Sequence, residues 1–168
     1  WARLGIGTVG QVLRTNAGAT APEWAASIAT KQFFVPCFSG TDGAPPTSLG
    51  YTGYVLDHVT DVAKISFRLP NDYVSMTSVK VIMIPSTTGA FDWTVTTNFA
   101  ATGEAYNANT DTATADGQAA TNLQMLELTI SDAFTGVAAN DIVGVTFGCD
   151  LWTNVTAVHV IGLDVKYV

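Results

Sequence analysis

The stretch Val62-Ala-Lys-Ile-Ser-Phe-Arg-Leu69 alternates apolar and polar residues from Ala63 to its end. The apolar side chains occupy every second position, and the positions between them carry Lys64, Ser66 and Arg68. Because successive side chains of a β-strand point to opposite faces, this order predicts a strand with one buried face and one solvated face. Such strands are typical of antiparallel sheets, so the stretch indicates an antiparallel β-protein.

Similar patterns recur through the rest of the chain. Alternating apolar segments run from Phe91 to Phe99, from Leu123 to Ile130, from Ile142 to Cys149 and from Val155 to Val168. No segment has the spacing of an amphipathic helix of three turns. We therefore expect seven or eight strands and an all-β fold, an antiparallel β-sandwich with a jelly-roll-like topology.

Two of the expected strands have apolar residues on both faces, in residues 79–84 and 158–161. A strand of a simple sandwich buries one face only, so these segments need a second cover. That cover is either a long loop or a neighbouring protomer. The candidate oligomer contacts in these two strands are Ile82, Ile84, Val158 and Val160.

The first 30 residues differ from the rest. Trp1-Ala2 recurs as Trp24-Ala25, and the segment between them is rich in glycine. A unit that ends as it began is typical of one link in a longer array. Such a unit is too short to bury a core of its own. We therefore expect a neck over residues 1–30 and a β-sandwich head over residues 31–168.

Charge and composition exclude several classes of function. Charged residues make up only 12% of the chain and the net charge is −7, with seven Lys and Arg that form no basic stripe. These features disfavour nucleic-acid binding. No apolar run is long enough to span a membrane. Low charge with 48% hydrophobic residues indicates a surface covered by neighbours, although a single β-domain with a threonine-rich solvent face is the alternative.

No residue pattern indicates a catalytic or metal site. His159 lies in an apolar strand, where a satisfied core histidine is the usual case, and His58 has only aspartates nearby in an expected loop. Residues 104–116 are rich in side chains whose oxygen atoms could bind calcium, but they lack the residue spacing of an EF-hand loop. We therefore favour a solvated loop for this segment. Cys37 and Cys149 each lie on the apolar side of an expected strand, which predicts two buried thiols. A disulfide between them is the alternative. We expect no enzyme, no cofactor and no metal.

Loop aromatics are the remaining candidates for binding. Tyr51 and Tyr54 flank Gly53 in an expected loop, and Trp152 follows Leu151 in another. Aromatic rings stack on the apolar faces of sugars, and they also fill oligomer interfaces. We favour the interface for Trp152 and leave Tyr51 and Tyr54 open between a glycan contact and an interface. Tyr106 is a further loop aromatic without an assigned role.

The segment Gly7-Thr-Val-Gly-Gln-Val-Leu-Arg-Thr-Asn-Ala-Gly-Ala-Thr-Ala-Pro-Glu-Trp24 resembles a motif of bacteriophage tail fibres and related virion appendages. In those proteins a Gly-x-x-Gly-Gln-Val-Leu start, an Asn-Gly-type turn and a Pro-x-Trp end recur before a terminal β-domain. Residues 134–141 and 160–163 more weakly resemble β-domains of phage and metagenomic virion proteins.

This resemblance implies a homotrimeric fibre in which three chains share the neck and carry a β-sandwich head. Trp24 would pack at the junction of neck and head. The residues that would line the shared axis of the neck are Leu4, Ile6, Val9, Val12 and Leu13.

These features predict a phage virion structural protein, a trimeric tail or head fibre whose head adheres to the host surface. The expected partners are further copies of the chain, other virion proteins and a host cell-surface glycan, without nucleic acid or membrane insertion. The expected location is the virion. The alternative is a capsid decoration or cement protein, whose head grips the shell while its glycine-rich arm inserts among neighbours.

Overall fold

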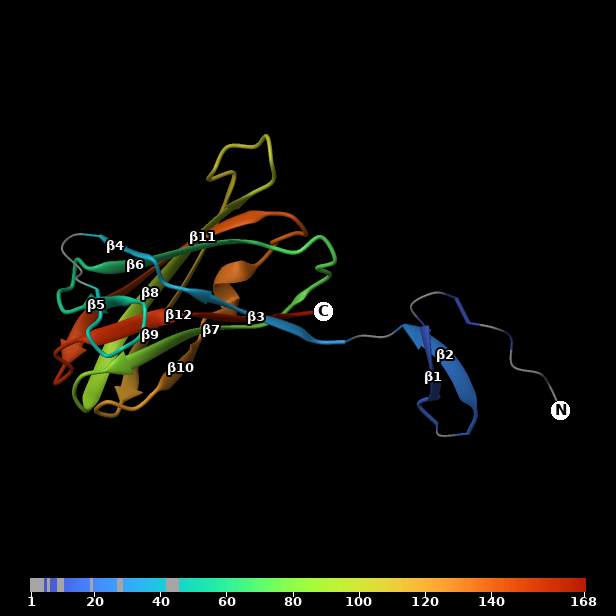
Figure 1. Ribbon diagram of the computed structural model, residues 1–168, viewed down its shortest axis with the longest axis horizontal. Coiled ribbons are helices and arrows are strands. Elements are labelled where there is room, and N and C mark those ends of the chain that lie inside the picture. Colours follow the sequence, from blue (N-terminus) through green and yellow to red (C-terminus); the bar gives the residue numbers. More distant parts are fainter. Residues whose placement is uncertain (1–4, 6, 9–10, 19, 27–28, 42–45) are drawn as a thin grey trace. The chain divides into compact units, whose positions relative to one another are not determined.

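The computed structural model describes residues 5, 7–8, 11–18, 20–26, 29–41 and 46–168. The chain divides into two compact units, residues 1–30 and residues 31–168 (Figure 1).

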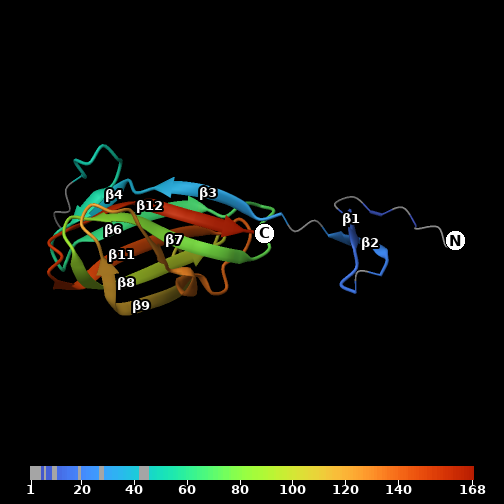
Figure 2. The same cartoon turned by 90° about the horizontal axis from the view of Figure 1, so that it is seen from below.

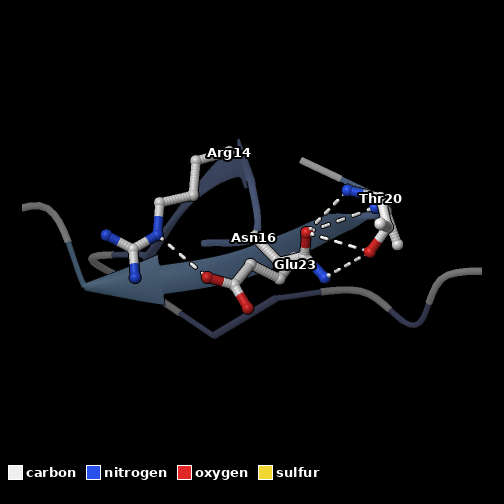
Figure 3. A network of polar contacts seen from close by, with 5 residues as sticks. Arg14, Asn16, Thr20 and Glu23 are labelled. Carbon is white, nitrogen blue, oxygen red and sulfur yellow. Dashed lines mark hydrogen bonds and ion pairs between the residues drawn. The ribbon is translucent and has the colours of Figure 1, made fainter. Parts of the chain in front are cut away.

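The first unit is built on a β-hairpin. Strand β1 (Gln11–Thr15) pairs antiparallel with strand β2 (Pro22–Ala26). Asn16 organises the loop between them, because its side-chain Oδ1 accepts hydrogen bonds from the backbone N–H groups of Thr20 (2.9 Å) and Ala21 (3.3 Å) (Figure 3). A side chain that hydrogen-bonds the backbone in this way favours a tight turn.

Trp24 is the packing centre of this hairpin. Its indole N–H donates to the Gly5 carbonyl at 2.6 Å, and its ring lies so close to Gly7 that an added Cβ would come within 2.5 Å of it. Val12 and Leu13 stay 46% and 53% exposed. A two-stranded sheet with exposed apolar residues is marginally stable alone. The neck contacts predicted at Val12, Leu13 and Trp24 remain predictions, and those at Leu4, Ile6 and Val9 lie outside the described residues.

The second unit, the head, is a β-sandwich of two five-stranded antiparallel sheets (Figures 1 and 2). The first sheet contains, in spatial order, β10 (Leu126–Thr129), β7 (Met76–Pro85), β12 (Val158–Tyr167) and β3 (Lys31–Pro36), with β5 (Tyr54–Leu56) paired to the start of β12. The second sheet contains β4 (Ser39–Thr41), β6 (Val62–Arg68), β11 (Ile142–Thr153), β8 (Gly89–Ala100) and β9 (Asn109–Ala120). A 3-10 turn, η1 (Ser131–Phe134), precedes β11.

After β3, each strand lies in the opposite sheet from the strand before it, except β9, which pairs with β8 in the same sheet. This order is jelly-roll-like and confirms the prediction of an all-β antiparallel sandwich. Within the described residues, no helix is long and apolar enough to cross a membrane.

Alternating residues of β6, β8 and β11 fill the space between the sheets. Phe91, Val145 and Phe147 are fully buried, and Trp93 stacks on Phe147 with ring centroids 6.3 Å apart. Cys37 and Cys149 are buried as thiols and form no disulfide, in agreement with the favoured prediction. The alternation of residues 62–69 holds, because the residues between its apolar positions point outward.

A β-bulge explains the two apolar faces of residues 158–161. Val158 and Val160 belong to the core and are 0% exposed. The ladder between β12 and β7 shifts register between Val160 and Gly162, which makes Ile161 an extra residue and moves the core-facing series to the other parity. The prediction that Val158 and Val160 contact a second protomer is therefore wrong, because the chain's own core covers them.

The outer face of β12 is also covered from within the chain. In the loop of residues 46–54, the Thr47 hydroxyl hydrogen-bonds Nδ1 of His159 at 2.7 Å. Of the two covers left open by the sequence, a loop is the one present on β12. Ile84 is buried within the head as well, so the prediction that it contacts a second protomer is also wrong. Ile82 is half-buried and stays a predicted contact.

Residues 109–120 form strand β9, although the sequence favours a solvated loop over residues 104–116. Its residues are Asn, Thr, Asp, Ala, Gly and Gln, without an apolar alternation. It lies at the edge of its sheet beside β8, where its side chains remain largely exposed. Backbone pairing with β8 and the strand propensity of threonine therefore stabilise this strand, whereas burial of apolar side chains contributes little.

We expect Phe147→Ala to lower the free energy of unfolding by about 3–5 kcal/mol, because it leaves a cavity between the sheets. Phe38→Ala removes a side chain that is 71% exposed and should change stability by less than about 0.5 kcal/mol. Urea titration of both variants measures the difference. Equal decreases in the free energy of unfolding of the two variants would contradict the assignment of Phe147 to the core.

Candidate functional site

A groove of about 610 Å³ crosses the outer face of the sheet β4-β6-β11-β8-β9. Its floor is a grid made by outward residues of the three central strands, whose register places them side by side. Because each strand contributes every second residue, the rows are about 7 Å apart. The three rows of the grid are Arg68-Ile142-Ala100, Ser66-Gly144-Asn98 and Lys64-Thr146-Thr96.

Gly144 lies at the centre of this grid and gives the groove its depth. A Cβ added to Gly144 would meet only the backbone carbonyl of Asn98, at 3.9 Å, so the space above the strand is open. Ser66 and Asn98 flank it with short polar side chains. The floor therefore offers hydrogen-bonding groups around a hollow.

The wall of the groove is the loop of residues 101–108, between β8 and β9. Figure 1 shows this loop, in yellow, projecting from the top of the head. The Glu104 carboxylate accepts a hydrogen bond from the Ala101 N–H at 2.9 Å, and the Glu104 N–H donates to the Ala101 carbonyl at 3.1 Å. A second turn follows, with the Ala108 N–H donating to the Ala105 carbonyl. The loop is thus held by its own hydrogen bonds.

Tyr106 lines the groove from this loop and is 81% exposed. An aromatic ring so exposed beside polar residues is available to stack on a ligand. The sequence identifies Tyr106 as a loop aromatic but gives no sign of its partners on β6 and β11. One signal was available: Gly144 occupies an outward position of a strongly alternating strand, where a polar side chain is usual.

Three charged residues lie in the groove, Lys64 and Arg68 on the floor and Glu104 in the wall. The Arg68 Nη2 donates to the Thr102 hydroxyl at 3.4 Å, which directs its guanidinium toward the loop. The sequence shows Lys64 and Arg68 as parts of a solvated face but does not assign them to a site.

Tyr51 and Tyr54 line a second, smaller pocket of about 300 Å³, together with Cys37 and Phe38. Tyr51 is 50% exposed, whereas Tyr54 is half-buried in β5. Gly53 between them fixes the local path, because an added Cβ would come within 2.2 Å of the Val160 carbonyl. The structure thus brings both predicted tyrosines to one pocket, apart from the groove residues.

Asp61 has a structural role in the turn beside His58. The Asp61 carboxylate accepts hydrogen bonds from the backbone N–H groups of Asp57 (3.1 Å) and His58 (3.0 Å), so it stabilises a turn and does not orient the His58 ring. Trp152 lies in β11 rather than in a loop, and its side chain lies outside the described part of the structure. Its interface role stays a prediction.

Acidic residues near the predicted oxygen-rich loop are separately engaged. The Asp111 carboxylate accepts a hydrogen bond from the Thr135 N–H at 2.8 Å, and the Asp92 carboxylate accepts one from the Gly117 N–H at 2.7 Å. Among the residues that the structure describes, no three His, Cys, Asp or Glu side chains gather in a way that would hold a metal ion.

No family model and no curated protein matches the chain. One similar solved structure is the CBM36-1 domain of a multidomain xylanase from the hindgut metagenome of Trinervitermes trinervoides, with a TM-score of 0.46 and 12% identity over 80% of this chain and 96% of that one. Another is the family 11 carbohydrate-binding module of the cellulosomal cellulase Lic26A-Cel5E of Clostridium thermocellum, with a TM-score of 0.43 and 9% identity over 96% and 97%.

The enzymatically active domain of bacteriophage CBA120 tailspike protein 4 is also similar, with a TM-score of 0.35 and 10% identity over 82% of this chain and 19% of that one. At these values the comparisons assign neither a family nor a ligand to this chain.

We expect the head to lose stability through His159 as the pH falls below the usual imidazole pKa of about 6.5. Burial lowers the pKa of His159 below its usual value, so the unfolded chain takes up a proton in this range before the folded chain does. Acid therefore favours unfolding, and His159→Gln should flatten this part of the stability profile. Urea unfolding across the range measures it, with His58→Gln as the control. If the free energy of unfolding of His159→Gln depended on pH as steeply as that of the unaltered chain, His159 would not be the group responsible.

Proposed function

We propose that the head binds a carbohydrate chain in the groove and that the protein is the adhesion module of a phage virion appendage. The observation that carries the binding proposal is the pairing of Tyr106, 81% exposed in the wall, with an open floor of small and polar residues. Sugars present apolar ring faces and hydroxyl-bearing edges. In the groove, the Tyr106 ring matches the apolar faces and the polar residues of the floor match the edges.

The residues of the groove floor suit a ligand that carries hydroxyl groups better than they suit an apolar ligand. Ser66, Asn98 and Thr146 each carry a side chain that can donate or accept a hydrogen bond. A site for an apolar ligand is usually lined by hydrophobic and aromatic side chains. In this floor, Ile142 is the large apolar residue, and it lies in the row nearest the wall loop.

We propose binding without hydrolysis. Most glycosidases need two carboxyl groups on either side of the scissile bond. Glu104 is the one carboxylate among the described residues that line the groove, and it already accepts the Ala101 N–H. This arrangement supports a role in positioning the loop rather than in proton transfer.

The proposed place in a virion appendage rests on the motif of residues 7–24 and on the hairpin that it forms. Exposed Val12 and Leu13 on β1 offer apolar contact area to further copies of the chain. In a trimer, three heads bind one surface together, so contacts that are weak singly add through their effective concentration.

Tyr106→Ala should weaken binding to the recognised polysaccharide about tenfold, because a stacked ring contributes about 1–1.5 kcal/mol. Tyr51→Ala removes an equally large exposed ring from the other pocket and should leave affinity unchanged. A panel of immobilised xylan, mixed-linkage glucan, mannan and acidic polysaccharides, read by biolayer interferometry, gives the affinities. The length of each polymer should stay constant during incubation.

Gly144→Val provides a second variant, since it fills the hollow of the floor while valine suits a strand. It should abolish binding without lowering the thermal midpoint. Loss of binding in Tyr51→Ala, with Tyr106→Ala unaffected, would move the site to the smaller pocket. A shortened polymer would overturn the proposal of binding without hydrolysis.

The full chain should have about three times its 17.6 kDa mass in light scattering. Leu13→Glu should shift it toward the monomer, because a charge at a shared apolar contact is poorly tolerated. Arg14→Gln changes the neighbouring exposed residue, which forms an ion pair with Glu23 within the same hairpin, and should preserve the trimer. A monomeric wild-type chain at micromolar concentration would contradict the trimer.

A further inference from the structure

The groove floor holds two cations that have no ion-pair partner among the described residues. These are Lys64 and Arg68, both exposed on the outer face of β6. The chain has seven Lys and Arg against fourteen Asp and Glu, so carboxylates are plentiful elsewhere on its surface. The other described cations form the pairs Arg14–Glu23, Lys31–Asp72, Lys80–Glu127 and Lys166–Asp164.

The two cations are spaced along the groove. They lie four residues apart on one strand, which separates their Cα atoms by about 13 Å. Arg68 uses one Nη2 contact on Thr102, and its remaining N–H groups are left for a ligand. Lys64 lies beside Thr146 in the third row of the floor. Glu104 adds a single negative charge in the wall, so the groove carries net positive charge within an acidic chain.

We infer that the groove takes an acidic polysaccharide, with one sugar carboxylate at Arg68 and another at Lys64. This inference rests on the proposed function, because it names the class of carbohydrate bound there. A guanidinium matches a carboxylate with two parallel hydrogen bonds, and an ammonium binds one as a point charge. Tyr106 then stacks on a sugar ring near the Arg68 end.

The spacing of the cations favours this ligand over a nucleic acid. Duplex DNA carries one charge per about 1.7 Å, and its binding sites neutralise many phosphates at once. Two cations about 13 Å apart, in a chain of net charge −7, suit a polymer whose charges are spaced more widely than those of duplex DNA. The repulsion from the rest of the chain is screened beyond about 8–10 Å at physiological salt, so the local cations decide the contact.

The test compares polygalacturonate, alginate and polysialic acid with the carboxyl-reduced form of each polymer, in which every carboxylate has become a primary alcohol. We expect at least one acidic polymer to bind about tenfold tighter than its reduced form, with affinity that falls as salt rises from about 50 to about 500 mM. Neutral xylan, glucan and mannan are measured alongside, and poly-dT tests the nucleic-acid alternative.

Arg68→Gln should weaken binding to the acidic polymer about tenfold and also reduce its salt dependence, while Arg68→Lys should recover part of the affinity. Glu104→Gln should act in the opposite direction and strengthen binding, since the amide oxygen can still accept the Ala101 N–H. Lys80→Gln is the matched control, because it removes the same charge from the other sheet. It should leave affinity unchanged.

The outcomes separate the inference from the function on which it rests. Equal or tighter binding of neutral or carboxyl-reduced polymers overturns the acidic ligand and leaves carbohydrate binding in place. Failure of every polysaccharide, acidic and neutral, overturns both. Preferential binding of poly-dT assigns the groove to nucleic acid and overturns the inference. An equal loss of affinity in Lys80→Gln and Arg68→Gln reveals a general charge effect and overturns the role of the groove cations.

Discussion

Each side chain on a central strand of the head has two directions open to it, into the space between the sheets or outward. The inner direction is filled by large apolar residues such as Phe91 and Phe147, and this packing holds the two sheets together. The outward residues of β6, β8 and β11 are thereby fixed in a grid whose rows and spacing follow from the ladder. The floor of the groove is a property of this grid, so its shape is as rigid as the core beneath it.

The sequence predicts the part of the fold that depends on alternation. The pattern of residues 62–69 identifies β6 and the direction of each of its side chains. It fails at Ile161, because a bulge changes the parity of β12 and looks like a strand with two apolar faces. It also fails for β9, whose threonines and aspartates resemble a loop because most of its side chains are exposed and leave no apolar alternation in the sequence.

The groove lies beyond sequence reasoning for a different reason. Ser66, Gly144 and Asn98 meet in one row although nearly 80 residues separate the first two, and strand order decides which residues become neighbours. Strand order depends on long-range pairing, which leaves no local pattern. By contrast, Tyr51 and Tyr54 are close in sequence, and their shared pocket could be predicted from that proximity.

The loop of residues 101–108 is fully exposed and is held by hydrogen bonds within itself. Its sequence can therefore drift, lengthen or be exchanged with little effect on the sandwich that carries it. Substitutions in this loop and substitutions in the core therefore differ in their effect on the stability of the head. A lineage built on this scaffold can therefore reshape the wall of the groove by altering one short hairpin tip, while the sequence of its core is kept by the demands of stability.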